Sequence, residues 1–273
     1  MGFLFTKITS KVYFLIKKHM EPNVNEYGQI NFNLPHDIVR LPSDGIFYTS
    51  KKKNVKVGYL TASDENIIVN MDGRKTIKET IILPLLRNKM YEPDLRPEEL
   101  LDGDIEAILI FLRNTSFGPE YKIMANDPAT GKSFESSVLL DELNIKKPKV
   151  KPDEDGTFTT TLPKSNITVK LKPINMRDSL EIENILDQYP QGRVSPIVTL
   201  RLNKTIVEID GSKDRSEISK FIEIMPISDS KYIRTFMNEN EPRLDLNREI
   251  IAPSGEKVSV NIAFGVEFFR PFF

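Results

Sequence analysis

The side chains that most often carry out chemistry in proteins are scarce in this sequence. It contains no Cys and two His, His19 and His36, which both lie near the N-terminus. Without Cys, the chain has no thiolate nucleophile, disulfide, iron–sulfur cluster or cysteine-bound zinc. With no His after position 36, a Ser–His–Asp triad or a three-His metal site in the main body is not expected. The sequence therefore predicts no catalytic residue and no metal ligand.

Two short motifs resemble functional sites but lack parts that the chemistry requires. Gly131-Lys132-Ser133 resembles the end of a phosphate-binding loop, yet Asn126 stands where that loop needs its first Gly. The motif also joins two expected strands, whereas a phosphate loop leads into a helix whose amides face the anion. Asp102 and Asp104 could form an acid–base pair, but two Asp at a helix start more often cap the helix and oppose its dipole. We therefore predict no enzymatic activity, no cofactor and no small-molecule substrate. A nucleotide-binding enzyme that uses Gly131-Lys132-Ser133 remains the alternative from another class.

Length and charge are those of a folded globular protein. The chain has 273 residues, with 38 Lys and Arg against 39 Asp and Glu, so the formal net charge is −1. This balance argues against a broad surface for nucleic acid. No apolar run approaches the roughly 20 residues that a helix needs to cross a bilayer. The expected partners are therefore neither nucleic acids nor membranes.

Hydrophobic periodicity predicts helices followed by a β-hairpin in the first half of the chain. Helices are expected over residues 61–71 and 77–86. A stronger helix opens at Asp102, with apolar residues at the spacing i, i+3, i+4, i+7, namely Ile105, Ile108, Leu109 and Leu112. Alternating apolar and polar residues on both sides of a turn at 127–131 then predict two paired strands.

The second half shows the same order of elements. Strands are expected over 157–162 and 167–171, followed by helices that carry Ile182, Ile218 and Ile233, and by a second hairpin around a turn at 252–255. The segment 197–209 has signals for both helix and strand, and the cap at Ser195-Pro196 favours a helix. We predict an α+β fold of two small helix-plus-β-hairpin units, which arose by an internal duplication and are joined by a charged linker.

The boundaries follow from composition. Residues 1–40 form an N-terminal amphipathic arm, and residues 41–145 form the first α+β unit. The linker is placed at 146–156, where Pro and charged residues replace the apolar pattern. The second unit covers 157–273 and ends in an aromatic tail.

The two ends of the chain are the candidate partner-binding sites. The arm carries one apolar stripe at helical spacing, and the last ten residues contain five Phe, which are costly to leave in water. Packing of each end on its own domain is the competing interpretation. The partner-binding candidates are Leu4, Ile8, Val12, Leu15, Phe268, Phe269, Arg270, Phe272 and Phe273.

Several segments, in order along the chain, resemble the baseplate hub protein family of T-even-type contractile-tailed bacteriophages. The resemblance rests on Leu41-Pro-Ser-Asp-Gly-Ile-Phe-Tyr48, Tyr59-Leu-Thr-Ala-Ser-Asp-Glu65, Gly103-Asp104, Ala107-Ile-Leu-Ile-Phe-Leu-Arg113, Ser116-Phe-Gly-Pro-Glu-Tyr121, Phe221-Ile-Glu-Ile-Met-Pro-Ile-Ser-Asp-Ser230 and Phe264-Gly-Val-Glu-Phe-Phe269. Many relatives carry Cys-Pro-x-Cys at the two hairpin turns. This chain has Asp127-Pro-Ala-Thr130 and Ala252-Pro-Ser-Gly255 there. Apolar packing is therefore expected to hold the hairpins that a metal would hold elsewhere.

The resemblance implies a structural component of the phage tail baseplate, at or near the hub, that acts through contacts with other baseplate or tail proteins. It implies a location in the virion after synthesis in the bacterial cytoplasm. An assembly chaperone that leaves before the tail matures is the alternative within the same class.

Overall fold

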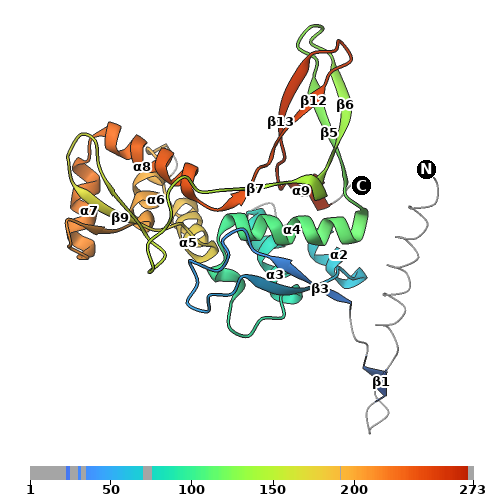
Figure 1. The fold of residues 1–273 in the computed structure, drawn as a ribbon, viewed down its shortest axis with the longest axis horizontal. Helices are drawn as coiled ribbons and strands as arrows, with labels where there is room; N and C mark the ends of the chain where they lie inside the picture. The colour runs from blue at the N-terminus through green and yellow to red at the C-terminus, as the bar shows by residue number, and fades with distance from the viewer. Residues whose placement is uncertain (1–22, 25–29, 32–34, 70–75, 191, 270–273) are drawn as a thin grey trace.

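The computed structural model shows a mixed α+β chain built around one long helix, α4. The structure describes residues 23–24, 30–31, 35–69, 76–190 and 192–269. The α+β class predicted from the sequence is confirmed, with helices and small antiparallel sheets in both halves. The internal duplication is not confirmed. Figure 1 shows α4 at the centre, with the first part of the chain on one side of it and two hairpins rising from the other.

The first half begins with a pair of short strands and then forms helices that pack around α4. Strand β1 (Asn23–Val24) pairs with β2 (Ile30–Asn31), and β3 (His36–Arg40) pairs antiparallel with β4 (Asn54–Gly58). The helical segments that follow are α2 (Ala62–Val69), η1 (Lys78–Ile82), α3 (Leu83–Lys89), the single turn η2 (Pro97–Glu99) and α4 (Asp102–Phe117). Each of the expected helices is therefore present, with Pro84 tolerated in the first turn of α3.

Helix α4 buries the apolar residues that its periodicity marks. Ile105, Ile108, Leu109 and Leu112 are each at most 4% exposed. The helix ends at Gly118, whose positive φ of +85° is accessible to glycine without a steric penalty. The chain then enters the hairpin of β5 (Glu120–Asn126) and β6 (Ser133–Leu139), as predicted.

The middle of the chain forms a second group of elements. After η3 (Leu140–Glu142) and β7 (Ile145–Lys146), strands β8 (Phe158–Thr161), β9 (Thr168–Leu171) and β10 (Ile206–Ile209) form an antiparallel sheet in the order β10-β9-β8. The helices are α5 (Met176–Asp187), α6 (Ile197–Thr205), α7 (Arg215–Ile224) and α8 (Ile227–Asn240). Asn175 caps α5 and Asp214 caps α7, each by accepting backbone N–H groups with its side chain.

The ambiguous segment at 197–209 contains both structures. It starts as helix α6 and becomes strand β10 at Ile206. The prediction of one helix is therefore correct to Thr205 and wrong beyond it. The β-branched residues at the end of the segment pair with β9, where they fit a sheet better than a helix.

The chain then returns to α4. Strand β11 (Arg243–Leu244) pairs with β7, and β12 (Asn247–Ile251) pairs with β13 (Lys257–Asn261) in the second predicted hairpin, before the short helix α9 (Val266–Phe269). This second hairpin lies beside the first one (Figure 1), with β12 in contact with β6. The sequence pattern assigned the two hairpins to different units.

The buried residues fall into two clusters that divide the chain accordingly. The first surrounds α4 and takes in Leu244, Ile250, Ile262, Phe268 and Phe269 from the C-terminal segment. The second lies among β8–β10, α6, α7 and α8. The division into units at 41–145 and 157–273 remains a prediction, but buried apolar residues between 244 and 269 pack in the first cluster.

The segment predicted as the linker is bound to α8. Lys146 donates from Nζ to the carbonyl oxygen of Asn238, and the backbone N–H of Val150 donates to Oδ1 of Asn240 at 2.7 Å. Between the two clusters, the ring of Phe47 packs on that of Phe158 with 5.8 Å between centroids. The clusters therefore share contacts through side chains as well as through the chain itself.

Candidate interaction surfaces

Most of the predicted partner-binding residues lie outside the described part of the chain. This applies to Leu4, Ile8, Val12 and Leu15 of the arm, and to Arg270, Phe272 and Phe273 of the tail. Their role in binding a partner remains a prediction.

Phe268 and Phe269, in contrast, are core residues of this chain. They are 0% and 1% exposed. The ring of Phe268 lies 4.8 Å from that of Phe264, 5.0 Å from that of Phe269 and 5.5 Å from that of Tyr121, measured between centroids. For these two rings, the structure shows the competing interpretation, in which the tail folds back on its own hairpin. Their predicted place at an interface is corrected because no ring surface is left for a partner.

Arg113 explains why the aromatic residues gather at this end of α4. Its side chain is buried, with the guanidinium carbon 5.0 Å from the ring centre of Tyr121 and 5.7 Å from that of Phe268. Nη1 donates to the carbonyl oxygen of Gly118 at 2.8 Å, and Nη2 donates to that of Glu120 at 3.1 Å. Burial lowers the pKa of Arg113. The charged group thus ties the end of α4 to the hairpin and to α9.

The two hairpin turns that carry the Pro motifs meet in space. The carboxylate of Asp127 accepts from the backbone N–H of Ala129 in its own turn at 2.9 Å, and from that of Ser254 in the other turn at 3.1 Å. These bonds lower the pKa of Asp127 below its ordinary value, against a raising effect of burial. The expectation that apolar packing alone holds the hairpins is therefore incomplete. Side chains such as Val138 and Ile250 do pack in the first cluster, and Asp127 adds a polar link at the tips.

Of the acidic pair considered for catalysis, Asp104 has a structural role. Asp104 is 0% exposed, and it accepts from the backbone N–H of Ser43 at 2.9 Å and from the hydroxyl of Tyr48. Burial raises the pKa of both Asp104 and Tyr48. The hydroxyl of Tyr48 in turn accepts from the backbone N–H of Leu101. Asp104 therefore fixes the 41–48 loop on the start of α4, and its carboxylate is closed to a substrate.

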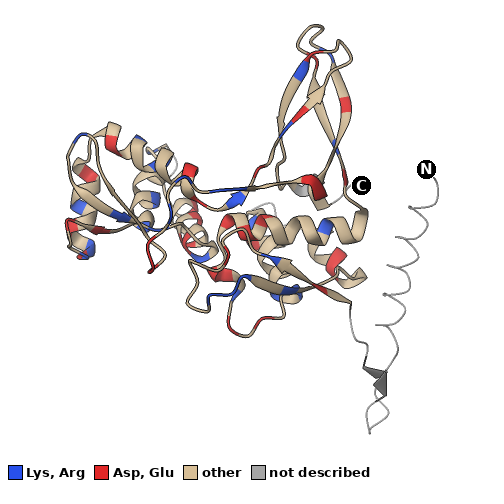
Figure 2. Cartoon of the chain, viewed as in Figure 1, with Lys and Arg blue, Asp and Glu red and all other residues tan. Residues whose placement is uncertain are grey.

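The motif Gly131-Lys132-Ser133 lies in the turn and first residue of the β5–β6 hairpin, with Gly131 at a φ of +67°. It leads into a strand, so no helix N-terminus follows it. Among the described residues, no group of three or more His, Cys, Asp or Glu is placed to hold a metal ion. No helix in the described part of the chain is long and apolar enough to cross a membrane. Figure 2 shows Lys, Arg, Asp and Glu mixed over both halves of the molecule.

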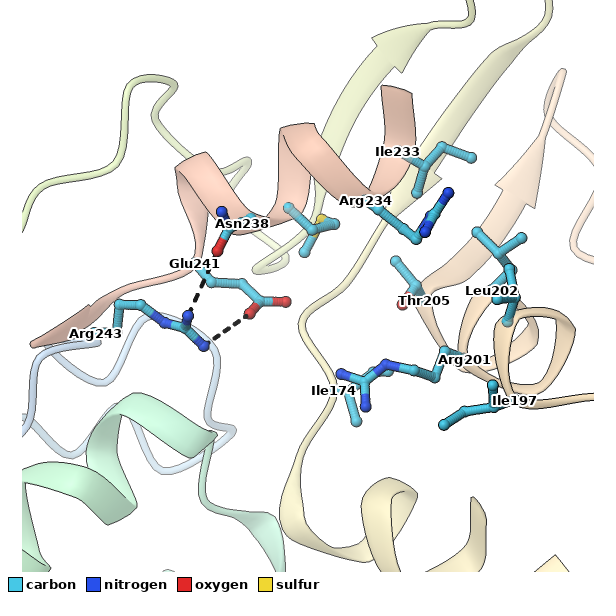
Figure 3. A pocket seen from close by; sticks show the side chains of 12 residues that line it. Ile174, Ile197, Arg201, Leu202, Thr205, Ile233, Arg234, Asn238, Glu241 and Arg243 are labelled. Carbon is cyan, nitrogen blue, oxygen red and sulfur yellow. Dashed lines mark hydrogen bonds and ion pairs between the residues drawn. The ribbon is translucent and has the colours of Figure 1, made fainter. Parts of the chain in front are cut away.

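A pocket of about 430 Å³ in the second cluster was not predicted from the sequence. Figure 3 shows it among side chains from α6, from α8 and from the segment that leads into β11. Its lining combines apolar side chains with Arg201, Arg234, Arg243 and Glu241. Nη2 of Arg243 lies 4.0 Å from Oε2 of Glu241.

Two partly buried carboxyl groups lie close enough to Arg243 for its charge to act on them, Glu106 on α4 and Glu241 in the segment before β11. Burial raises the pKa of Glu106 to about 7 and that of Glu241 to about 7. Arg243 opposes the shift in both groups, while Asp102 increases it. Oε2 of Glu106 has no hydrogen-bond partner within the described part of the chain. Both carboxyl groups therefore keep their protons at pH values at which an ordinary carboxyl group is ionised.

Close packing between α4 and β11 places these groups together. A Cβ on Gly103 would lie 2.2 Å from the carbonyl oxygen of Pro242 and 2.6 Å from Cα of Arg243. Only glycine fits at this contact. Gly103 and Asp104 thus have different roles. Gly103 lets the backbone at 242–243 approach α4 closely, and Asp104 holds the 41–48 loop by hydrogen bonds.

The sequence matches the family described as T4 bacteriophage base plate protein over residues 45–270. No curated protein and no solved structure matches the chain significantly. The matched region includes α4, both hairpins and the pocket, which is most of the chain. The chain therefore belongs to the T4 bacteriophage base plate protein family.

Proposed function

We propose that the chain is a non-enzymatic structural component of a contractile phage tail baseplate, at or near the hub. The observation that carries this proposal is the family match over residues 45–270. In this role the protein acts through contacts with other baseplate or tail proteins. It is made in the cytoplasm of the bacterial host and functions in the virion.

The use of acidic side chains in the structure supports a scaffold role. Asp104 and Asp127 each join segments that are far apart in the sequence. Asp229 does the same, because its carboxylate accepts from the backbone N–H groups of Lys164 at 2.8 Å and Ser165 at 2.9 Å. These carboxylates hold loops in place, which is what a part with a fixed shape in a larger assembly requires.

The two ends of the chain remain the proposed sites of attachment. The stripe of Leu4, Ile8, Val12 and Leu15 would supply an apolar face on one side, and Phe272 and Phe273 would supply aromatic anchors on the other. Buried aromatic side chains at an interface contribute a large share of the binding free energy. Removal of residues 270–273 is expected to leave the folded chain intact, since Phe268 and Phe269 stay in place, and to prevent incorporation into baseplates.

Quantitative mass spectrometry of purified phage particles tests the proposal. A structural component is expected at a fixed ratio to the other baseplate proteins after gradient purification. An assembly chaperone would be abundant in infected cells and absent from particles. Absence from particles would refute the proposed role and favour the chaperone.

A further inference from the structure

The pocket between α6 and α8 has an excess of positive charge. Three arginines and one glutamate line it. Glu241 and the amide of Asn238 face Arg243, the latter at 3.5 Å from Nη1. Arg201 and Arg234 form no ion pair within 4.0 Å among the described residues, although the charge of Arg201 lowers the pKa of Glu241 from a longer distance. Nε of Arg234 donates only to the carbonyl oxygen of Ser230 in its own helix.

The walls of the pocket are apolar and extend to the surface. Leu202, Ile233 and Met237 form its buried side. Ile197 and Val198 form an exposed rim, with exposed fractions of 42% and 40%. An exposed apolar surface around charged groups is typical of a binding site for a partner that supplies both kinds of contact.

We propose that this pocket binds a segment of a partner protein in which an acidic side chain stands next to an apolar one. The carboxylate pairs with Arg201 and Arg234, and the neighbouring apolar side chain covers the rim formed by Ile197 and Val198. This inference rests on the proposed function, because it names the chemistry by which a neighbouring tail protein attaches.

Charge complementarity selects this occupant. A guanidinium presents several N–H donors in one plane, which matches the two oxygens of a carboxylate. Figure 3 shows Arg201 on α6 and Arg234 on α8, with their guanidinium groups on different sides of the pocket. Both side chains are exposed, so they can turn toward a carboxylate bound between the helices. An apolar segment without a carboxylate would leave both charges unpaired in the contact, which costs binding free energy.

The measurement uses methyl NMR on the full chain with two matched probes, N-acetyl-Phe-Glu-amide and N-acetyl-Phe-Gln-amide. The methyl groups of Ile197, Val198 and Met237 report binding in the pocket. Saturable shifts of these methyl signals are expected with the Glu probe. The Gln probe is expected to bind about tenfold or more weakly, because a hydrogen bond to a charged group is lost.

Variants of the two arginines show how much their charges contribute to binding of the Glu probe. Arg201→Gln and Arg234→Gln are expected to bring the affinity for the Glu probe down to that for the Gln probe. Both residues are exposed, so the fold is expected to tolerate the changes. Arg193→Gln removes the same charge from an exposed loop outside the pocket and is expected to change nothing.

Equal affinities for the two probes, shifts confined to other methyl groups, or no saturable shift would each overturn the proposal. Tighter binding of inorganic phosphate or of a single-stranded oligonucleotide at the same methyl groups would also overturn it, since the site would then recognise phosphate. These outcomes concern the isolated chain, so they leave the stoichiometry in virions as a separate test of the proposed function.

Discussion

Replacing Phe268 with Ala distinguishes a core role of the C-terminal aromatics from an interface role. The ring is 0% exposed and lies against Phe264, Phe269 and Tyr121. The guanidinium of Arg113 lies 5.7 Å from its centre. If these contacts hold the C-terminal segment on α4, the substitution must destabilise the free protein, before any partner is present.

The expected loss follows from the contacts. Phe→Ala changes in a core cost about 3–5 kcal/mol, which includes the cavity that is left. The loss of aromatic pairs and of the contact with Arg113 places Phe268 in the upper part of this range. For a chain of this size, the corresponding fall in Tm is roughly 6–20 °C.

Thermal unfolding of the purified chain, followed by far-UV circular dichroism, gives the measurement. Tyr189→Ala serves as the control, because this ring is 37% exposed on the segment after α5. The control is expected to shift Tm by no more than a few degrees. An unchanged Tm for Phe268→Ala would refute the core assignment and return the ring to the predicted interface.

Three further predictions concern the packing and ionisation of the first cluster. Gly103→Ala is expected to cost about 1–3 kcal/mol of unfolding free energy, because a Cβ there would lie 2.2 Å from a carbonyl oxygen just before β11. Gly265→Ala, which meets no atom within 4 Å, is its control, and equal urea midpoints for the two variants would contradict the close contact. Glu106 has a pKa of about 7 when folded against 4.5 in an ordinary setting, so the folded state binds more protons between these values and stability falls as pH rises through them. The loss of unfolding free energy amounts to up to about 3 kcal/mol. Glu106→Gln is expected to reduce this loss, as measured by urea unfolding at pH 5 and pH 8. The same pH dependence in variant and parent would exclude the effect. Lys89→Met is expected to cost about 3–5 kcal/mol of unfolding free energy in the same assay, because it leaves the buried Asp64 without its counter-ion. Nζ of Lys89 lies 2.5 Å from the carboxylate of Asp64. A loss below about 1 kcal/mol would contradict this prediction.

The local elements of the fold could be predicted from the sequence because they depend on neighbouring residues. The spacing of Ile105, Ile108, Leu109 and Leu112 identified α4, and alternation identified both hairpins. At 197–209 the signals for helix and for strand overlap, and the prediction of one helix missed the strand that begins at Ile206.

The arrangement of these elements could not be predicted in the same way. The carboxylate of Asp104 accepts a hydrogen bond from a backbone N–H 61 residues away, and that of Asp127 accepts one from a backbone N–H 127 residues away. Neither separation leaves a periodic signal. The repeated order of helices and hairpin indicated two units, whereas the second hairpin packs beside the first because its apolar face completes the cluster around α4. The role of Phe268 could not be predicted for the same reason, because it depends on the contact with Arg113 near the end of α4.

The pocket illustrates the same limit for functional residues. Arg201, Arg234 and Arg243 are scattered over some 40 positions, each in a helix or strand that also carries other charges. No spacing rule connects them. Their charges come together because α6, α8 and β11 line the same pocket.

Cross-linking mass spectrometry on purified virions tests most directly whether the chain is a built-in part of the baseplate. Lys231 on α8 is exposed and provides an amine for the cross-linker. We predict cross-links from this protein to other baseplate or tail proteins within intact particles, at a fixed yield from one preparation to the next. Particles in which the protein is absent, or cross-linked only to itself, would contradict it.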